Sequence, residues 1–280
     1  MRKLCVIGDP VEHSLSPLIQ NAMIRAAGLD CVYDARRVAG CDTAQWLAQA
    51  KREGYIGFNA TMPHKEHLVP LMDALSEDAA EFRSVNTVCI RDGRVYGYNT
   101  DGDGVLRALL EADMDPMGKN VLVLGAGGAA KAVVHKLVRR GAKHVTVANR
   151  TVRRAGALCS QVSAPGMTAC GFSRETLCRH ASDSQLVINC TSLGMTGTAG
   201  QFEDLSFLEE LRPGAGVFDL IYSPAQTELL GAAGTLGYKT ANGLGMLIWQ
   251  AMFALEQFTQ TKLDGAVMAA AARKALEENV

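Results

Sequence analysis

The chain has 280 residues, of which 48% are hydrophobic and 20% charged, and its formal net charge is −1. This length is sufficient for two domains with cores of their own, and the composition is typical of a globular protein. A net charge near zero argues against electrostatic binding of nucleic acid or of a membrane surface. The apolar-rich run from Leu244 to Leu255 is far shorter than the roughly 20 residues that a membrane-spanning helix requires.

The eight cysteines occur singly, with no C-x-x-C pair and no histidine at ligand spacing. We therefore expect buried free thiols, without a disulfide framework or a metal site. Free thiols are typical of a reducing compartment, so a cytoplasmic location is expected. The apolar run before Gly8 is too short for a signal peptide, and none is expected. Both a monomer and a homodimer are compatible with the sequence.

The N-terminal part of the chain alternates between strand and helix patterns, an order typical of α/β folds. Strands are predicted at Lys3–Gly8, Cys31–Arg37 and Tyr55–Asn59, and helices at Pro17–Ala27 and Thr43–Glu53. Ser16 is expected to be the N-cap of the first helix, with Pro17 at its first position. Ser14 supplies a second hydroxyl in the same loop, and the two together suit a polyhydroxylated ligand.

Polar residues follow the predicted strand that ends at Asn59, where the sequence reads A-T-M-P-H-K up to Lys65. Open α/β sheets bind ligands just beyond the carboxyl ends of their strands, so Lys65 is a candidate site residue. An exposed surface lysine is the commoner situation. A hairpin with an early Asn86 is predicted from residue 85 to residue 98. The following N-T-D-G-D-G opens a helix that Asp101 or Asp103 can cap.

A glycine-rich turn, G-A-G-G-A-A at residues 125–130, lies between a continuous apolar strand predicted at residues 120–124 and a helix with apolar residues at helical spacing. In the G-x-G-x-x-A pattern Gly125 makes the tight turn, Gly127 lets a pyrophosphate approach the backbone, and Ala130 allows close helix packing. Amides at the helix N-terminus then bind the anion. Small residues also mark ordinary tight turns, but the flanking βαβ pattern favours a dinucleotide site.

The next predicted strand ends in N-R-T-V-R-R at residues 149–154. A site selective for NAD usually has an acidic residue here, and this chain has none. The guanidinium groups of Arg150, Arg153 and Arg154 can bind a 2′-phosphate, while Asn149 and Thr151 supply neutral hydrogen bonds. We therefore predict NADP(H). The alternative is a solvated basic helix start, although cations at a helix N-terminus are unfavourable without an anion.

The remaining strong patterns are two strands and one long helix. The strands are predicted at Gln185–Ser192 and Gly216–Tyr222, and the helix at Leu244–Gln257. Gln250 lies on the apolar face of this helix, where its amide needs a polar partner such as a substrate hydroxyl.

Several sequence blocks occur together in one order along the chain. They are H-S-L-S-P, N-A-T-M-P-H-K, V-N-T, N-T-D-G-D-G, G-A-G-G-A-A, N-R-T, N-C-T-S-L-G-M and N-G-L-G-M-L-I-W-Q. With these blocks the chain resembles the shikimate dehydrogenase family over essentially its whole length. The resemblance implies an α/β fold with a substrate-binding domain at 1–101 plus 244–280, on which C-terminal helices pack, and a Rossmann NADP-binding domain at 102–243. It also implies reduction of 3-dehydroshikimate to shikimate, a step toward chorismate and the aromatic amino acids.

The resemblance further implies site residues, with Lys65 and Asp101 as the catalytic pair and no metal ion. Which of the two passes the proton is left open. The implied substrate-binding residues are Ser14, Ser16, Asn59, Thr61, Lys65, Asn86, Asp101, Tyr222 and Gln250. The implied cofactor-binding residues are Gly125, Ala126, Gly127, Gly128, Ala129, Asn149, Arg150, Thr151, Arg153, Arg154, Leu220, Gly243 and Met246. Leu220 and Gly243 rest on the resemblance alone.

The chain departs from the commonest family pattern at Ala60, His64, Arg83-Ser84 and Cys190. We expect His64 to be a partly exposed neighbour of Lys65. One alternative function is a quinate/shikimate dehydrogenase that uses NAD or both cofactors, since a polar site that rejects analogues lacking a hydroxyl can accept one more. A non-catalytic dinucleotide sensor is the other alternative, but such a protein does not need both members of the catalytic pair.

Overall fold

The computed structural model of the protein describes residues 1–198 and 200–279. The chain forms two compact units, which are described separately below. Unit 1 consists of Met1–Gly104 together with the segment from Leu247 onward, and unit 2 of Val105–Met246. The functional division predicted from the sequence, 1–101 plus 244–280 for the substrate and 102–243 for NADP, stays a prediction, because compactness alone assigns no ligand to either unit.

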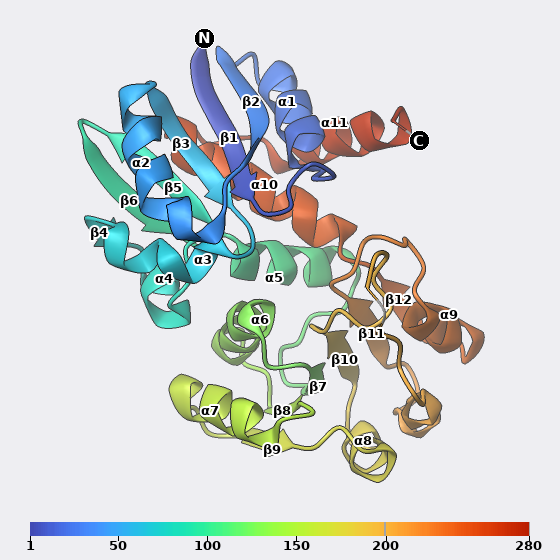
Figure 1. The fold of residues 1–280 in the computed structure, drawn as a ribbon. Coiled ribbons are helices and arrows are strands. Elements are labelled where there is room, and N and C mark those ends of the chain that lie inside the picture. Colours follow the sequence, from blue (N-terminus) through green and yellow to red (C-terminus); the bar gives the residue numbers. More distant parts are fainter. Residues whose placement is uncertain (199, 280) are drawn as a thin grey trace. The chain divides into compact units, whose positions relative to one another are not determined.

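Unit 1 is built on a mixed sheet. Its strands are β1 (Arg2–Gly8), β2 (Cys31–Arg37), β3 (Tyr55–Ala60), β4 (Ala74–Leu75), β5 (Thr87–Arg91) and β6 (Arg94–Tyr98). They form a six-stranded sheet in the order β2-β1-β3-β5-β6-β4 (Figure 1). The first three strands are parallel, and β5 runs antiparallel to both β3 and β6. The parallel part brings the carboxyl ends of β1 and β3 to the same edge.

The helices of unit 1 include segments from both ends of the chain. They are α1 (Ser16–Ala26), η1 (Gly40–Asp42), α2 (Thr43–Arg52), α3 (His64–His67), η2 (Val69–Leu71), α4 (Glu77–Phe82), α10 (Leu244–Thr259) and α11 (Gly265–Glu277), while α5 (Asp101–Glu111) begins here and continues into unit 2. The C-terminal helices pack back on the N-terminal part, as predicted. Gln20 Nε2 of α1 donates to the Ala251 carbonyl of α10 at 3.0 Å, and α1 packs against α11.

The core of unit 1 lies against the buried strands of its sheet. Trp46 of α2 packs edge-on against Tyr55 and Phe58 of β3, with ring centroids 5.6 and 6.2 Å apart. Phe258 of α10 packs closely on Gly57, where an added Cβ would lie 2.6 Å from its ring. This packing buries most of β3, and β3 leads directly into the segment that carries Lys65.

Unit 2 is a parallel sheet covered by helices. Its strands are β7 (Asn120–Leu124), β8 (His144–Ala148), β9 (Met167–Cys170), β10 (Leu186–Asn189), β11 (Gly216–Asp219) and β12 (Lys239–Ala241). Its other elements are α6 (Gly128–Arg139), α7 (Val152–Val162), α8 (Arg174–Ala181), η3 (Ser206–Glu210) and α9 (Glu228–Thr235). The strands pair in parallel in the order β9-β8-β7-β10-β11-β12, which is the Rossmann order 3-2-1-4-5-6. The predicted α/β fold class is therefore confirmed.

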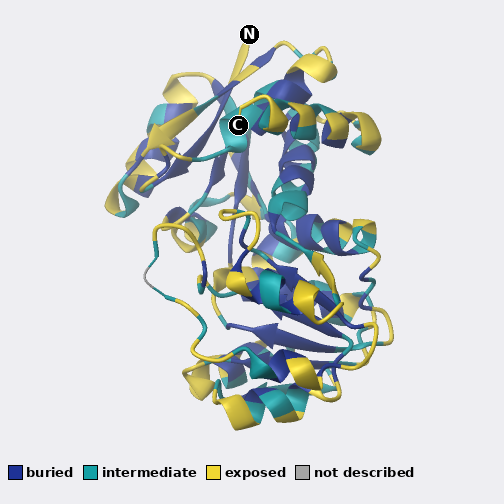
Figure 2. Cartoon of the chain, turned by 90° about the vertical axis from the view of Figure 1, so that its right-hand side faces the viewer, coloured by how far each residue is buried: buried dark blue, intermediate teal, exposed yellow. Residues whose placement is uncertain are grey.

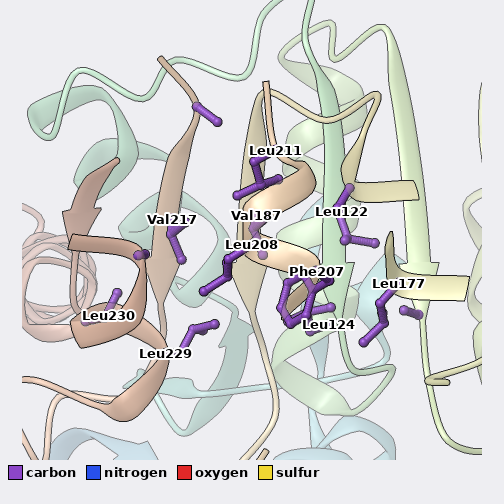
Figure 3. Packing of buried hydrophobic residues seen from close by; sticks show 14 of the residues in the cluster. Leu122, Leu124, Leu177, Val187, Phe207, Leu208, Leu211, Val217, Leu229 and Leu230 are labelled. Atoms are coloured by element: carbon purple, nitrogen blue, oxygen red, sulfur yellow. The ribbon is translucent and has the colours of Figure 1, made fainter. Parts of the chain in front are cut away.

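The central strands of each sheet are buried (Figure 2). In unit 2, Leu122 and Leu124 of β7 and Val187 of β10 contribute to one apolar cluster with Phe207 and Leu208 of η3 (Figure 3). A strand buried on both faces requires a continuous apolar run, which explains why residues 120–124 could be recognised in the sequence.

Several predicted boundaries are wrong for local reasons. Ser16 is the first residue of α1 and not its N-cap; Leu15 occupies that position, and the Ser16 amide donates to Ser14 Oγ at 3.2 Å. The strands β10 and β11 end earlier than predicted, at Asn189 and Asp219. Each of these side chains accepts a hydrogen bond from the backbone amide two residues later, at 3.0 Å, which turns the chain.

The cysteines are free, but they are not all buried as predicted. Four are buried, three are partly exposed, and Cys41 is exposed. Among the described residues, none of the helices combines the length and the apolar character needed to cross a membrane.

Candidate functional site

Lys65 and Asp101 form an ion pair within unit 1, with Nζ and Oδ2 2.6 Å apart. Lys65 lies on α3, just after the carboxyl end of β3, and Asp101 is the first residue of α5. The lysine side chain is 31% exposed and the aspartate side chain 12%. The lysine side chain is therefore partly accessible, while the carboxylate that pairs with it is largely shielded from water.

Asn86 holds the other oxygen of this carboxylate. Its Nδ2 donates to Asp101 Oδ1 at 2.7 Å, and its Oδ1 accepts from the Thr100 amide at 2.9 Å. The neighbouring Val85 amide donates to the Lys65 carbonyl at 2.9 Å. Residues 85 and 86 thus bind both members of the ion pair. Because Asp101 accepts one hydrogen bond on each oxygen, its carboxylate plane has a fixed orientation.

Asn59, near the end of β3, helps to hold Asn86 in place. Its Nδ2 donates to the Asn86 carbonyl at 3.0 Å and to Thr87 Oγ1 at 2.9 Å, and its Oδ1 accepts from the Tyr33 hydroxyl at 2.8 Å. The amide is 8% exposed and all its polar atoms are used within the protein. These contacts favour a supporting role, and its predicted contact with substrate stays a prediction. Sequence reasoning missed Tyr33, which has no signal that distinguishes it from an ordinary strand residue, and it gave no role to Thr87, although Thr87 lies in the V-N-T block.

His64 is fully buried, so the expectation that it is partly exposed is wrong. Its ring nitrogens lie 2.8 Å from the Val38 carbonyl and 2.8 Å from Thr43 Oγ1. A carbonyl only accepts, so Nε2 carries a proton. Burial lowers the pKa of His64 below its usual value, although the hydrogen bond to Val38 raises it. The two hydrogen bonds of the imidazole therefore tie α3 to residues 38 and 43.

The remaining predicted substrate residues lie in different surroundings. The hydroxyl groups of Ser14, Ser16 and Thr61 are on partly exposed residues that follow β1 and β3, which are parallel neighbours. Gln250 is partly exposed on α10, and its Nε2 donates to the Leu247 carbonyl of its own helix at 2.9 Å. Tyr222 belongs to unit 2, where it follows β11, and burial raises its pKa.

The glycine-rich turn of unit 2 has two kinds of glycine. Gly125 is required by the protein itself, because its φ is +104° and an added Cβ would lie 3.0 Å from Thr191 Cγ2. At Gly127 and Gly128 an added Cβ would meet nothing within 4 Å. Gly127 is the N-cap of α6 and makes no side-chain capping bond. The helix N-terminus is therefore open, and the turn has room for the pyrophosphate of a dinucleotide. The buried Ala130 packs as predicted.

The arginine-rich segment after β8 is exposed at the start of α7. Arg150, Arg153 and Arg154 are exposed and form no ion pair within residues 1–198 and 200–279. The first turn of α7 contains no acidic residue, and Thr151 makes no side-chain cap. Asn149 Nδ2 donates to the Thr151 carbonyl at 2.9 Å and shapes the turn. Three cations beside an uncapped helix N-terminus are suited to a phosphate group.

Leu220 and Gly243 lie side by side in unit 2. An added Cβ at Gly243 would be 1.9 Å from the Leu220 carbonyl oxygen, so only glycine fits there. The Gly243 amide donates to the Ile221 carbonyl at 3.0 Å. Met246 follows on the first turn of α10 and is partly exposed. The structure thus brings together two residues that rested only on a sequence resemblance, although their contact with a cofactor stays a prediction.

Comparison with known proteins gives consistent matches over both units. The family description "Shikimate dehydrogenase substrate binding domain" matches residues 6–88, and "Shikimate / quinate 5-dehydrogenase" matches residues 108–201. Shikimate dehydrogenase (NADP(+)) of Alkaliphilus metalliredigens is 39% identical over 262 residues, which cover 92% of this chain and 91% of that protein.

Two solved structures show how similar the folds are. Shikimate 5-dehydrogenase from Thermus thermophilus, in complex with NADP(H) and shikimate, is 33% identical with a TM-score of 0.84, covering 98% of this chain and 100% of that chain. Quinate dehydrogenase from Corynebacterium glutamicum, in complex with NAD, is 33% identical with a TM-score of 0.85, covering 96% and 98%. The fold alone therefore does not distinguish the two substrates or the two cofactors.

Proposed function

The chain belongs to the shikimate dehydrogenase family, and on this basis we propose that it catalyses the reversible, NADPH-dependent reduction of 3-dehydroshikimate to shikimate. The observation that carries the proposal is the Lys65–Asp101 pair, held at 2.6 Å and oriented by Asn86. A dinucleotide-binding protein without catalytic activity has no need of such a pair, so the sensor alternative is not favoured.

Reduction of a ketone requires stabilisation of the developing alkoxide and a proton for it. The Lys65 ammonium donates a hydrogen bond to the carbonyl oxygen, and its positive charge stabilises the negative charge that develops there. Asp101 fixes the direction of the ammonium group, and the proton reaches the oxygen through this pair. NADPH, when bound, supplies the hydride. The chemistry needs no metal ion, and we found no group of three metal-ligating side chains among the described residues.

We propose that a set of polar residues binds the hydroxyls and the carboxylate of the substrate. These residues are Ser14, Ser16, Asn59, Thr61, Lys65, Asn86, Asp101, Tyr222 and Gln250. Support comes from the partly exposed hydroxyls that follow β1 and β3 at the same sheet edge as Lys65. Such a site rejects analogues that lack a hydroxyl, because its own buried polar groups would be left unpaired.

NADP(H) is the proposed cofactor, bound by the glycine-rich turn, the segment 149–154, Leu220, Gly243 and Met246. The absence of an acidic residue after β8 and the exposed arginines there favour a 2′-phosphate. Quinate with NAD is the alternative, and the arginines argue against it. The free cysteines support a cytoplasmic location. Sedimentation of the purified protein will distinguish a monomer from a homodimer.

Steady-state kinetics test the proposal directly. The purified protein is assayed with shikimate and with quinate, each with NADP+ and with NAD+, by absorbance at about 340 nm, where the reduced nicotinamide absorbs. We expect the highest kcat/KM with shikimate and NADP+. A higher kcat/KM with NAD+ contradicts the cofactor assignment, and NADPH binding without any shikimate-dependent reaction supports the sensor alternative.

A further inference from the structure

Asp219 is a fully buried carboxylate that has no part in the proposed chemistry. It lies at the carboxyl end of β11, directly opposite Asn189 at the end of β10, and both residues have no exposed surface. Asn189 Nδ2 donates to Asp219 Oδ1 at 3.0 Å. Burying a charged group is costly unless hydrogen bonds or an opposite charge compensate for the loss of water, so the position of this carboxylate calls for an explanation.

Three hydrogen bonds satisfy the carboxylate, and no ion pair to it is found in the described part of the chain. Besides the Asn189 amide, Oδ1 accepts from the Ile221 backbone amide at 3.0 Å, and Oδ2 accepts from Thr227 Oγ1 at 2.8 Å. Thr227 is also the N-cap of α9. Asp219 therefore joins the end of β10, the turn after β11 and the start of α9.

The turn after β11 carries residues predicted to contact ligands. The Leu220 amide donates to the Asn189 carbonyl at 3.0 Å, and the Gly243 amide donates to the Ile221 carbonyl at 3.0 Å. The hydrogen bond from the Ile221 amide to Asp219 Oδ1 fixes the turn between these two contacts. The close approach of Leu220 and Gly243 therefore depends on the hydrogen bond from the Ile221 amide to Asp219.

The hydrogen-bonded pair of Asp219 and Asn189 is also connected to the glycine-rich turn. Asn189 Oδ1 accepts from the Thr191 amide at 3.0 Å and from Thr191 Oγ1 at 2.7 Å. The Thr191 methyl group lies against Gly125, and the Cys190 amide donates to the Leu124 carbonyl at 2.8 Å. The buried pair is therefore connected to the loops after β7, β10 and β11.

We infer that Asp219, through Asn189, is a positioning residue that holds these loops of unit 2 in the geometry that binds the dinucleotide cofactor. This inference rests on the proposed function for the identity of the cofactor. The reason for a carboxylate here is its acceptor capacity: a single small side chain accepts three hydrogen bonds from three directions. An apolar residue of similar size would fill the volume but would leave the Ile221 amide and the Asn189 amide without acceptors.

The test is the dissociation constant of NADPH, measured by fluorescence without substrate, for Asp219→Ala, Asn189→Ala and Asp219→Asn. We expect Asp219→Ala to weaken binding by about tenfold or more, since it removes hydrogen bonds to a charged group. Asn189→Ala keeps the carboxylate but removes both hydrogen bonds from Thr191 to Asn189 Oδ1. It should weaken NADPH binding less than Asp219→Ala does. Asp219→Asn should restore most of the affinity, because its oxygen still accepts and its amide can donate to Thr227.

Tyr238→Phe is the matched control, since it also removes a partly buried hydrogen bond of unit 2, from the Tyr238 hydroxyl to the Leu211 carbonyl at 3.1 Å. Its melting temperature should fall while NADPH affinity stays at the wild-type value. The inference is overturned if Asp219→Ala or, should that variant not fold, Asn189→Ala binds NADPH as the wild type does. Wild-type protein that binds NADPH but does not oxidise shikimate refutes the proposed function and leaves this inference standing.

Discussion

Asp101→Asn is the substitution that most directly tests the proposed catalytic pair. The carboxamide has the shape of the carboxylate, and Asn86 Nδ2 can still donate to its oxygen as it does to Oδ1, at 2.7 Å. In the unsubstituted protein Lys65 Nζ donates to Oδ2 at 2.6 Å. In the variant an NH2 group replaces this oxygen and faces Lys65 Nζ. Two donors then face each other. The ion pair is lost while the side-chain volume and the bond to Asn86 are kept.

The expected effect follows from the surroundings of the pair. A hydrogen bond between charged groups contributes about 1.5–3 kcal/mol. With the carboxylate 12% and the lysine 31% exposed, screening by water removes only part of this contribution. The same bond orients the ammonium group toward the developing alkoxide, so its loss raises the barrier by a similar amount. At about 1.4 kcal/mol per factor of ten, kcat should fall about 10- to 150-fold.

The assay is steady-state oxidation of shikimate by NADP+ at saturating concentrations, with circular dichroism to verify the fold. Asp115→Asn is the matched control, because it breaks the Asp115–Arg140 ion pair, also 2.6 Å long, outside the predicted site. The control should keep the wild-type kcat. A folded Asp101→Asn protein with wild-type turnover refutes the role assigned to Asp101, and an equal loss in both variants shows that the effect is not specific to the pair.

Three further predictions concern the cofactor site and His64. Gly127→Ala adds a methyl group that meets no atom within 4 Å, so the melting temperature should not change. The affinity for NADPH should fall about tenfold, because the methyl group blocks the approach of the pyrophosphate. An unchanged affinity would contradict pyrophosphate binding by this turn. Arg153→Ala and Arg154→Ala should each raise KM for NADP+ and leave KM for NAD+ unaltered, whereas equal changes would exclude a 2′-phosphate contact. By NMR titration, with His64→Gln to assign the signal, His64 should titrate below the ordinary 6.5. Since its folded-state pKa is lowered, protonation should destabilise the fold as the pH falls below about 6.5, and a pKa at or above that value would refute the burial argument.

The parts of the fold that could be predicted have strong local signals. The strand at residues 120–124 was recognised with the observed boundaries because both of its faces are buried and its apolar run is unbroken. The glycine-rich turn was recognised because its small residues follow the G-x-G-x-x-A spacing between a strand and a helix. By contrast, α9 and β12 were not predicted, since both are short and contacts with strands distant in the sequence stabilise them.

The sequence by itself determined which chemical groups are available: a lysine and an aspartate for a carbonyl oxygen, small residues for a pyrophosphate, and arginines without an acidic neighbour for a phosphate. Only the tertiary structure decided what these groups do to one another. Residues 65 and 101 are far apart in the chain and meet because β3 and the first residues of α5 belong to one unit. His64 is buried, and Asp219 holds turns together, because packing between segments distant in the sequence sets burial and hydrogen-bond partners. Local pattern carries no information about such partners.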